Sequence, residues 1–213
     1  HMKADMAGAA AVLGVLRIIA QLRPNVAVTG LIPAAENMIS GKAYKVDDIL
    51  RARNGKTIEI DNTDAEGRLI LADALSYATE QGFDEVIDLA TLTGGAVIAF
   101  AHVWTAVMGN NQALIDRLIA SGNTVGEKMW MLPFDPEVRE MLDSDIADIR
   151  NSAGREASSI QGGMFLQDFI DETPWAHLDI AGTAFLEKKG RPYMPKHATG
   201  VPVRTLVEYL LRQ

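Results

Sequence analysis

The chain has 213 residues, of which 48% are hydrophobic, and its net charge is −8. This length and composition suffice for one large domain with a buried core, while the acidic balance and the lack of any Lys/Arg-rich run argue against nucleic acid or an anionic membrane as the main partner. Because the chain has no cysteine, disulfides and thiolate metal sites are excluded, which fits a reducing cytoplasm.

The first expected helix covers residues 6–23, where Ala, Leu, Val and Ile occupy every face. This pattern is typical of a helix that is buried all round. Lys3 and Asp5 precede it and would lie in the interior or at a cleft edge, where a charge is costly unless it is paired or bound to a metal. A capping role for Asp5 is an equal alternative. We expect no apolar run of membrane-spanning length.

The order of the next elements predicts an α/β protein. A β-branched run at residues 25–33 indicates a buried strand, and Asn54-Gly55 is a strong hairpin signal between two strands at residues 49–60. Further apolar runs predict strands at residues 86–92, 103–108 and 175–180, and helical spacing predicts helices at residues 69–79, 112–120, 162–169 and 203–211. Residues 135–154 are charged and aperiodic, so we expect a surface loop with a short helix, at a subunit contact. No internal repeat or linker is found, so residues 1–213 form one expected domain.

The stretch at residues 62–68, Asn-Thr-Asp-Ala-Glu-Gly-Arg, concentrates the chemistry of the chain. On an extended backbone Asp64 and Glu66 leave the same face and could hold a cation, while Arg68 could grip an anion. Gly67 would let a ligand approach the backbone. Read alone, the stretch is better explained as a helix cap made by Asn62, Thr63 or Asp64.

The context of this stretch favours a site. Asp64 and Glu66 fall at a strand-to-helix turn, and a second such turn at residues 91–95 contains two glycines that allow backbone groups to face a ligand. A tight structural turn is the alternative there. His177 and Asp179 share a strand face, where a hydrogen-bonded core histidine is the simpler interpretation.

Three acids, Asp5, Asp64 and Glu66, suggest a metal-dependent hydrolase. Carboxylate oxygens suit Mg, Mn and Zn, and a pair of ions can activate a water molecule and polarise a carbonyl. Three carboxylates are few for two ions, however, and none of the four histidines has the H-E-x-x-H spacing that would supply more ligands.

The stretch at residues 62–68 resembles the signature of the leucyl aminopeptidase family, cytosolic dinuclear metallopeptidases that remove N-terminal residues from peptides. Other segments resemble the same family over essentially the whole chain, namely residues 2–10, 32–37, 88–94 and 175–182. The resemblance implies the family's catalytic domain, with a mixed, largely parallel central sheet and helices on both faces.

By this resemblance Asp5, Asp64 and Glu66 are metal ligands for two ions, Mn or Zn, and Glu66 bridges them. Arg68 would hold a bicarbonate that acts as the base. Thr91 and Leu92 would meet the substrate through their backbone. The residues implied near the pocket for the substrate's first side chain are Met2, Gly94, Ala181 and Ala184. Ala184 is small where a relative can have methionine, which would enlarge that pocket.

The chain also departs from the family pattern. Family members carry a lysine ligand, a bridging aspartate and a catalytic lysine before the segment that matches Met2, and a separate N-terminal domain before these. We therefore expect a truncated catalytic domain, and Lys3 matches a different family position.

Two functions remain open at this stage. The first is a cytoplasmic aminopeptidase that acts on peptides as a homo-oligomer, by family a hexamer, together with the missing N-terminal part. The second is a non-catalytic assembly module of such an enzyme. A carboxylate-metal phosphoesterase fits the acids but not residues 91–94 and 175–182.

Overall fold

The computed structural model describes residues 2–188, 190 and 192–213. Its central sheet contains β3 (Val86–Ala90), β7 (Trp175–Asp179), β4 (Thr105–Gly109) and β5 (Met129–Met131), in that spatial order. β3 runs parallel to β7 and β4 parallel to β5, whereas β4 and β7 are antiparallel. The expected mixed, largely parallel sheet is therefore confirmed.

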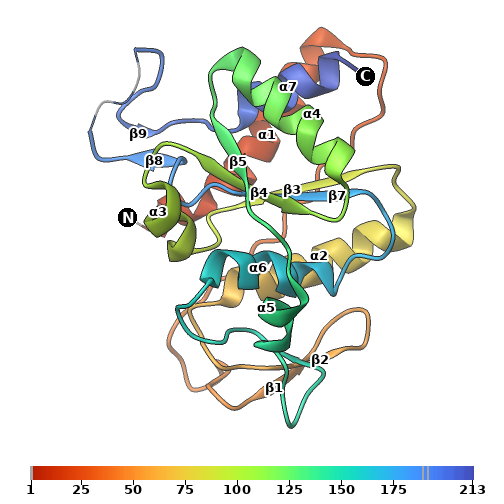
Figure 1. The fold of residues 1–213 in the computed structure, drawn as a ribbon, viewed down its shortest axis with the longest axis vertical. Coiled ribbons are helices and arrows are strands. Elements are labelled where there is room, and N and C mark those ends of the chain that lie inside the picture. Colours follow the sequence, from red (N-terminus) through yellow and green to blue (C-terminus); the bar gives the residue numbers. More distant parts are fainter. Residues whose placement is uncertain (1, 189, 191) are drawn as a thin grey trace.

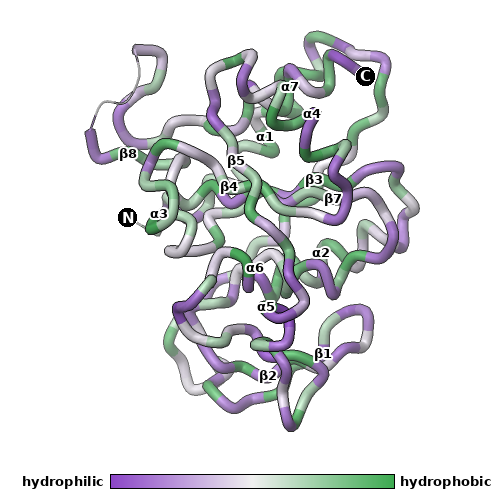
Figure 2. Tube along the Cα trace, in the orientation of Figure 1, coloured by the Kyte–Doolittle hydropathy of each residue, from purple (hydrophilic) through white to green (hydrophobic). Residues whose placement is uncertain are grey.

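Helices cover both faces of the central sheet (Figure 1). One face carries α1 (Ala7–Leu22), α4 (Gln112–Val125) and α7 (Val203–Leu211), and the other carries α2 (Glu66–Gln81) and α6 (Ser158–Gln167). The first layer packs around Val107 and Leu178, and the second packs around Phe165 and Trp175. Figure 2 shows the hydrophobic residues of the sheet between these layers. A strand buried on both faces reads as a continuous apolar run, which is why β3, β4 and β7 were predicted from the sequence. The three-residue strand β5, of which only Met129 is buried, was missed.

A smaller sheet lies beyond α6 and contains β1 (Ile49–Arg51), β2 (Thr57–Glu59) and β6 (Ile149–Arg150). β1 and β2 form the expected hairpin, with Gly55 at φ 89°, a left-handed conformation that glycine adopts without steric cost. The Asn54 side chain accepts the N–H of Lys56 at 3.0 Å and closes the turn. β2 pairs in parallel with β6, Ile58 opposite Ile149.

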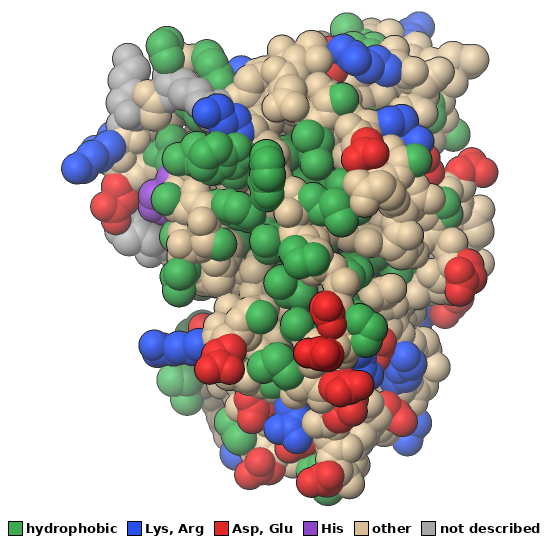
Figure 3. Space-filling model, viewed as in Figure 1, with side chains coloured by type: hydrophobic (Ala, Val, Ile, Leu, Met, Phe, Trp, Pro, Cys, Tyr) green, Lys and Arg blue, Asp and Glu red, His purple; other side chains and the backbone are tan. Residues whose placement is uncertain are grey.

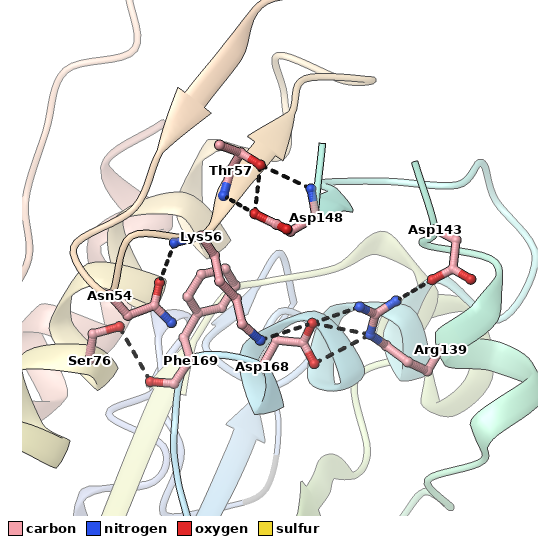
Figure 4. A network of polar contacts seen from close by, with 9 residues as sticks. All are labelled: Asn54, Lys56, Thr57, Ser76, Arg139, Asp143, Asp148, Asp168 and Phe169. Carbon is pink, nitrogen blue, oxygen red and sulfur yellow. Dashed lines mark hydrogen bonds and ion pairs between the residues drawn. The ribbon is translucent and has the colours of Figure 1, made fainter. Parts of the chain in front are cut away.

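A polar network connects the smaller sheet to the end of α6 and to Arg139 (Figure 4). The Asp148 carboxylate accepts hydrogen bonds from the N–H and the hydroxyl of Thr57, both at 2.7 Å. At the end of α6, Asp168 accepts a hydrogen bond from Arg139 Nη2 at 2.7 Å and lies 3.6 Å from the Lys56 ammonium. Arg139 belongs to α5 (Pro136–Glu140). The network fixes β2 and therefore the start of the loop that carries Asp64.

Two short elements complete the description. The 3-10 turn η1 (Met2–Met6) leads into α1, and a strand pair, β8 (Phe185–Leu186) with β9 (His197–Ala198), precedes α7.

The first helix is confirmed, but the expectation that it is buried all round is wrong. Its buried residues form one stripe, Gly8, Ala11, Val15 and Ile19. Leu13 is 59% exposed. Val12 and Leu16, beside this stripe, are only partly buried and line a large cavity as well as packing against the core. Composition alone does not show which apolar face of a helix meets the core.

The strand expected at residues 25–33 is also wrong. This segment has no helix or strand assignment, and among the described residues β3 pairs with β7 alone. Residues 26–35 and β3 both border the large cavity. A β-branched run forms a strand only where a neighbouring backbone can pair with it, and no described backbone does so here.

Residues 135–154 hold more structure than expected. They contain the short helix α5 and the strand β6, and they bury Leu142, Ile149 and Asn151 completely. Elements of five and two residues are too short to show a sequence period, which explains why their burial was missed. The expected subunit contact stays a prediction.

One described segment, Met2–Leu22, is long and apolar enough by length and composition to cross a membrane, with 21 residues and a hydropathy of 1.5. In this limited sense the expectation of no such run is wrong. Its Val15 and Ile19 belong to the core, although only 22% of its apolar window is buried. One helix of this kind is weak evidence, because core helices pass the same test.

Candidate functional site

The loop between β2 and α2 carries two of the expected metal ligands. The Asn62 side chain accepts the N–H of Asp64 at 2.9 Å and closes a local turn. α2 begins at Glu66, and its cap position, Ala65, makes no side-chain cap bond. The capping interpretation of residues 62–64 is therefore wrong. Glu66 lies in the first turn of α2, where a carboxylate complements the positive end of the helix.

Asn151 holds this loop in place and was missed in the sequence. Its Oδ1 accepts the N–H groups of Asp61 at 2.8 Å and Asn62 at 3.1 Å, and its Nδ2 donates to the Asn62 carbonyl at 2.7 Å. The side chain is fully buried. A polar residue directly after a two-residue strand carries no sequence signal, so nothing marked Asn151 beforehand.

Arg68 is buried although it is charged, with 6% of its surface exposed. Its Nη1 donates to the main-chain oxygen of Asn151 at 2.7 Å, and its guanidinium carbon lies 5.9 Å from the centre of the Phe165 ring. Burial lowers the pKa of Arg68 to about 10, and the negative charge of Asp179 opposes this shift. Nε has no partner among the described residues. A fixed guanidinium with an unused donor is suited to hold an anion.

Asp5 lies against the turn that follows β3. The Thr91 hydroxyl is 2.7 Å from Asp5 Oδ1 and 3.1 Å from the Asp5 main-chain oxygen. Asp5 does not cap α1, because the cap position is Met6 and has no side-chain cap bond. The contact joins the start of α1 to the end of β3. Asp5 therefore lies at the edge of the cavity, which agrees with the expected cleft-edge position and not with the capping role.

A buried carboxylate outside the expected set, Asp179, lies at the end of β7 with 1% of its surface exposed. Its Oδ1 accepts the N–H groups of Leu92 and Ala181, each at 3.2 Å, and its Oδ2 accepts the Thr93 hydroxyl at 2.6 Å. Burial raises the pKa of Asp179, and the charge of His177 and these donors oppose the rise. An acid ending an apolar strand was the available signal.

His177 is a hydrogen-bonded core residue, as the simpler interpretation expected. Its Nδ1 lies 2.6 Å from Asp88 Oδ1, and Asp88 Oδ2 accepts the indole N–H of Trp175 at 2.7 Å. Burial lowers the pKa of His177, but the charge of Asp88 outweighs burial, so the pKa is raised overall. The Nε2 atom of this fully buried ring has no partner among the described residues.

The candidate site opens onto a cavity of about 1050 Å³ between η1, α1, the start of α2 and the end of β3. The expected site residues that line it are Met2, Asp5, Asp64, Glu66, Arg68, Thr91, Leu92, Gly94 and Ala181. Ala184 instead lies in the core at 3% exposure, so its expected role near the pocket stays a prediction.

The three acids are suitable ligands for a divalent cation by their chemistry, but their side chains do not gather into one group. Carboxylate oxygens suit Mg, Mn and Zn. Within residues 2–188, 190 and 192–213, however, no three His, Asp or Glu side chains form a group that could hold an ion. Asp5, Asp64 and Glu66 therefore do not form such a group by themselves, and their role as metal ligands stays a prediction.

Comparison with known proteins decides the family. The model of the cytosol aminopeptidase family, catalytic domain, matches residues 1–207. The chain belongs to the cytosol aminopeptidase family. The resemblance of residues 62–68 to the leucyl aminopeptidase signature is thereby confirmed, and its fold implication agrees with the observed sheet and helix layers.

Related sequences are longer than this chain. A probable cytosol aminopeptidase of Geobacter sp. (strain M21) is 55% identical over 213 residues, which cover 100% of this chain and 43% of the relative. Another, from Solibacter usitatus (strain Ellin6076), is 52% identical over 205 residues, 96% of this chain and 42% of the relative. The chain thus spans less than half the length of these family members.

Two solved structures that are similar in sequence to this chain have the same fold. The bottromycin maturation enzyme BotP, in complex with Mn, superposes with a TM-score of 0.95 at 41% identity, over 99% of this chain and 47% of BotP. A tomato leucine aminopeptidase variant superposes with a TM-score of 0.90 at 42% identity, over 100% of this chain and 41% of the tomato chain.

Proposed function

We propose that this chain is the catalytic part of a metal-dependent aminopeptidase that releases leucine-like N-terminal residues from peptides. The observation that carries the proposal is the convergence of Asp5, Asp64, Glu66 and Arg68 on one cavity. These residues come from the start of α1 and from the loop and first turn of α2, two segments that are distant in the sequence. Membership of the cytosol aminopeptidase family supports the reaction class.

The proposed cofactor is a pair of divalent ions, Mn or Zn, with Asp5, Asp64 and Glu66 as part of the donor set and Glu66 shared between the ions. The Mn that accompanies BotP supports a divalent metal. Such ions, when bound, activate a water molecule and polarise the scissile carbonyl. Each ion needs four or more ligands, so further donors must join these three carboxylates.

Arg68 is proposed to hold a bicarbonate that serves as the base. The Asn151 carbonyl and the Phe165 ring fix the guanidinium plane, and the unused Nε leaves a donor for an anion. An anion held by a buried, oriented fork interacts more strongly than one in water, because the surrounding dielectric is low. Arg68 would thus position the base without titrating itself.

The turn after β3 is proposed to align the substrate through the backbone of Thr91 and Leu92. Met2, Gly94 and Ala181 would border the first side chain of the substrate, with Ala184 behind them. A Cβ placed on Gly94 would meet nothing within 4 Å, so this position opens onto free space. Such space is available for a ligand group.

The proposed assembly is a cytoplasmic homo-oligomer, by family a hexamer. Figure 3 shows hydrophobic side chains gathered over the region of α3 (Gly94–Phe100) and β5. Exposed apolar residues in these elements and beside β4 include Ile98 at 88%, Trp130 at 62% and Trp104 at 37%. Large exposed apolar side chains of this kind are typical of subunit contacts. The names of the cytosol aminopeptidase relatives support the location.

The test is Mn- or Zn-dependent hydrolysis of leucine p-nitroanilide. We expect Asp64→Ala to lower kcat/KM by at least ~1000-fold, because a lost ligand removes charge stabilisation at the reacting centre. Asp61→Ala is the matched control, since Asp61 is an exposed acid of the same loop that does not line the cavity. An unchanged rate in Asp64→Ala would overturn the proposal.

A second arm asks where the remaining donors come from. The chain is joined to the unmatched part of the Geobacter relative, of which it covers 43%. Turnover in the joined protein alone would show that this part completes the donor set. No turnover in either form, with both metals supplied, would contradict an aminopeptidase function.

A further inference from the structure

Two turns that border the cavity follow neighbouring parallel strands. Ala90 at the end of β3 is the pairing partner of Asp179 at the end of β7. Beyond these ends the chain turns at Leu92 and at Ala181, and both residues line the cavity. The spacing of the two turns therefore sets the shape of this part of the cavity wall.

A single carboxylate joins the two turns. Asp179 Oδ1 accepts the N–H of Leu92 and the N–H of Ala181, each at 3.2 Å. Its Oδ2 accepts the Thr93 hydroxyl at 2.6 Å and lies 3.4 Å from the Ser159 hydroxyl of α6. The four donors come from both turns, from the cap of α3 and from α6.

The Thr93 hydroxyl extends this arrangement into α3. It donates to Asp179 and accepts the N–H of Ala96, which is the side-chain cap of α3. Through Thr93, Asp179 therefore also fixes the position of the start of α3. A neutral or shorter side chain at this position could not satisfy all of these donors.

Hydrogen bonds to an ionised acceptor are about twice as strong as neutral ones, and a buried donor that loses its acceptor is costly. Asp88 of β3 also binds the side chains of His177 and Trp175, which adds side-chain contacts between β3 and β7. Movement of either turn would leave a main-chain N–H without its acceptor inside the protein. The carboxylate thus holds the two turns in a fixed position relative to each other.

We infer that Asp179 is a positioning residue of the candidate site, which fixes the Leu92 turn against the Ala181 turn and so shapes the pocket for the first side chain of the substrate. The role of that pocket rests on the proposed function. The coupling of the two turns is inferred from the hydrogen bonds of Asp179 and does not depend on the proposed function.

The coupling is tested by amide hydrogen exchange, followed by NMR in the whole chain. We expect Asp179→Ala, which removes the acceptor of both amides, to accelerate exchange of the Leu92 and the Ala181 amides by at least ~10-fold, with Val107 in β4 unchanged as the reference for global stability. Thr93→Val is the matched control, because it removes a donor to Oδ2 and leaves Oδ1 untouched. It should change both amides by less than ~2-fold.

Continued protection of either amide in Asp179→Ala would overturn the inference, as would equal acceleration in Thr93→Val. If Asp179→Ala does not fold, the unaltered protein decides the matter. Through-hydrogen-bond couplings from the Leu92 and Ala181 nitrogens to the Asp179 carboxyl carbon are then expected, and the absence of either would overturn the inference.

The link to substrate is tested by comparing leucyl and alanyl p-nitroanilides in the Mn-supplemented protein. We expect Asp179→Ala to raise KM for the leucyl compound more than it lowers kcat, and to change the leucyl-to-alanyl ratio of kcat/KM by at least ~3-fold. General destabilisation would lower both substrates equally, and an unchanged ratio would overturn the pocket role. If neither this chain nor the joined protein turns over either substrate, the proposed function fails while the exchange data still decide the coupling.

Discussion

Arg68 donates a hydrogen bond to the main-chain oxygen of Asn151 at 2.7 Å across 83 positions of sequence. The side chain of the same asparagine binds Asp61 and Asn62. One residue therefore sets both the loop that carries Asp64 and the guanidinium that lies beneath it. The position of Asp64 relative to Arg68 therefore depends on Asn151.

Replacing Asn151 should destabilise the fold more than replacing a surface asparagine. Asn151→Ala leaves two main-chain N–H groups and one carbonyl without their partner, so we expect a loss of about 2–4 kcal/mol in the free energy of unfolding. Asn54→Ala, which removes one exposed hydrogen bond to Lys56, should cost less than about 1 kcal/mol. Urea unfolding followed by circular dichroism measures both. Equal losses in the two variants would contradict the role of Asn151.

Arg68→Met should separate stability from activity. The pKa of Arg68 is lowered to about 10, against 12.5 in the unfolded chain, so the buried charge destabilises the folded state at every pH below 10. Removing that charge relieves this cost but leaves the Asn151 main-chain oxygen without its donor, so the opposing effects should change the free energy of unfolding at pH 7 by less than about 1 kcal/mol. Mn-dependent turnover should fall by at least ~100-fold.

Arg53→Met serves as the control for Arg68→Met, because Arg53 is an exposed arginine paired with Glu80. It should leave both turnover and the unfolding midpoint nearly unchanged. Retention of full activity in Arg68→Met would show that this guanidinium has no part in the reaction.

Gly8 is expected to tolerate no side chain. A Cβ at Gly8 would overlap the main-chain oxygen of Leu89, which cannot move without disturbing β3. We expect Gly8→Ala to lower Tm by at least about 5 °C. At Gly14, in the same helix, a Cβ would lie 3.1 Å from a methyl group of Val203, which can shift by a few tenths of an ångström, and the better helix propensity of alanine offsets this contact. Differential scanning calorimetry should therefore find Gly14→Ala within about 2 °C of the unaltered protein.

The pKa of the Asp148 carboxylate should respond to replacement of Thr57, whose hydrogen bonds are the main cause of its lowering. The hydroxyl and N–H of Thr57 lower the pKa of Asp148 below 3.8, so the stability that this carboxylate contributes is present above pH 3.8 and is lost as pH falls through the lowered pKa. Thr57→Val removes the hydroxyl and should raise the pKa of Asp148 part of the way toward 3.8. NMR titration of the carboxyl carbon measures the shift.

Asp171 provides the internal control for that titration, since the hydroxyl and N–H of Thr173 lower its pKa in the same way. Thr57→Val should leave the titration of Asp171 unchanged, and Thr173→Val should shift Asp171 without shifting Asp148. A shift of both carboxylates in either variant would mean that the fold has loosened generally.

Local signals in the sequence succeeded where the structure depends on neighbours a few residues apart. The Asn54-Gly55 turn predicted the hairpin because turn type is decided by the turn residues themselves. The strand at residues 25–33 failed because its apolar run needs a partner backbone that no local signal supplies. The capping interpretation of residues 62–64 failed because Asn62 closes a turn of its own before α2 begins.

The sequence by itself determined the helices and hairpin, the family to which the chain belongs, and the placement of Asp64, Glu66 and Arg68 at one strand-to-helix turn. Only the tertiary structure decided which face of α1 is buried and gave Asn151 and Asp179 their roles. The physical reason is distance along the chain: Asn151 binds Asp61 across 90 positions and Asp179 binds Leu92 across 87. Periodicity and turn chemistry act over a few residues, whereas hydrogen-bond partners of this kind exist only after the sheet has brought them together.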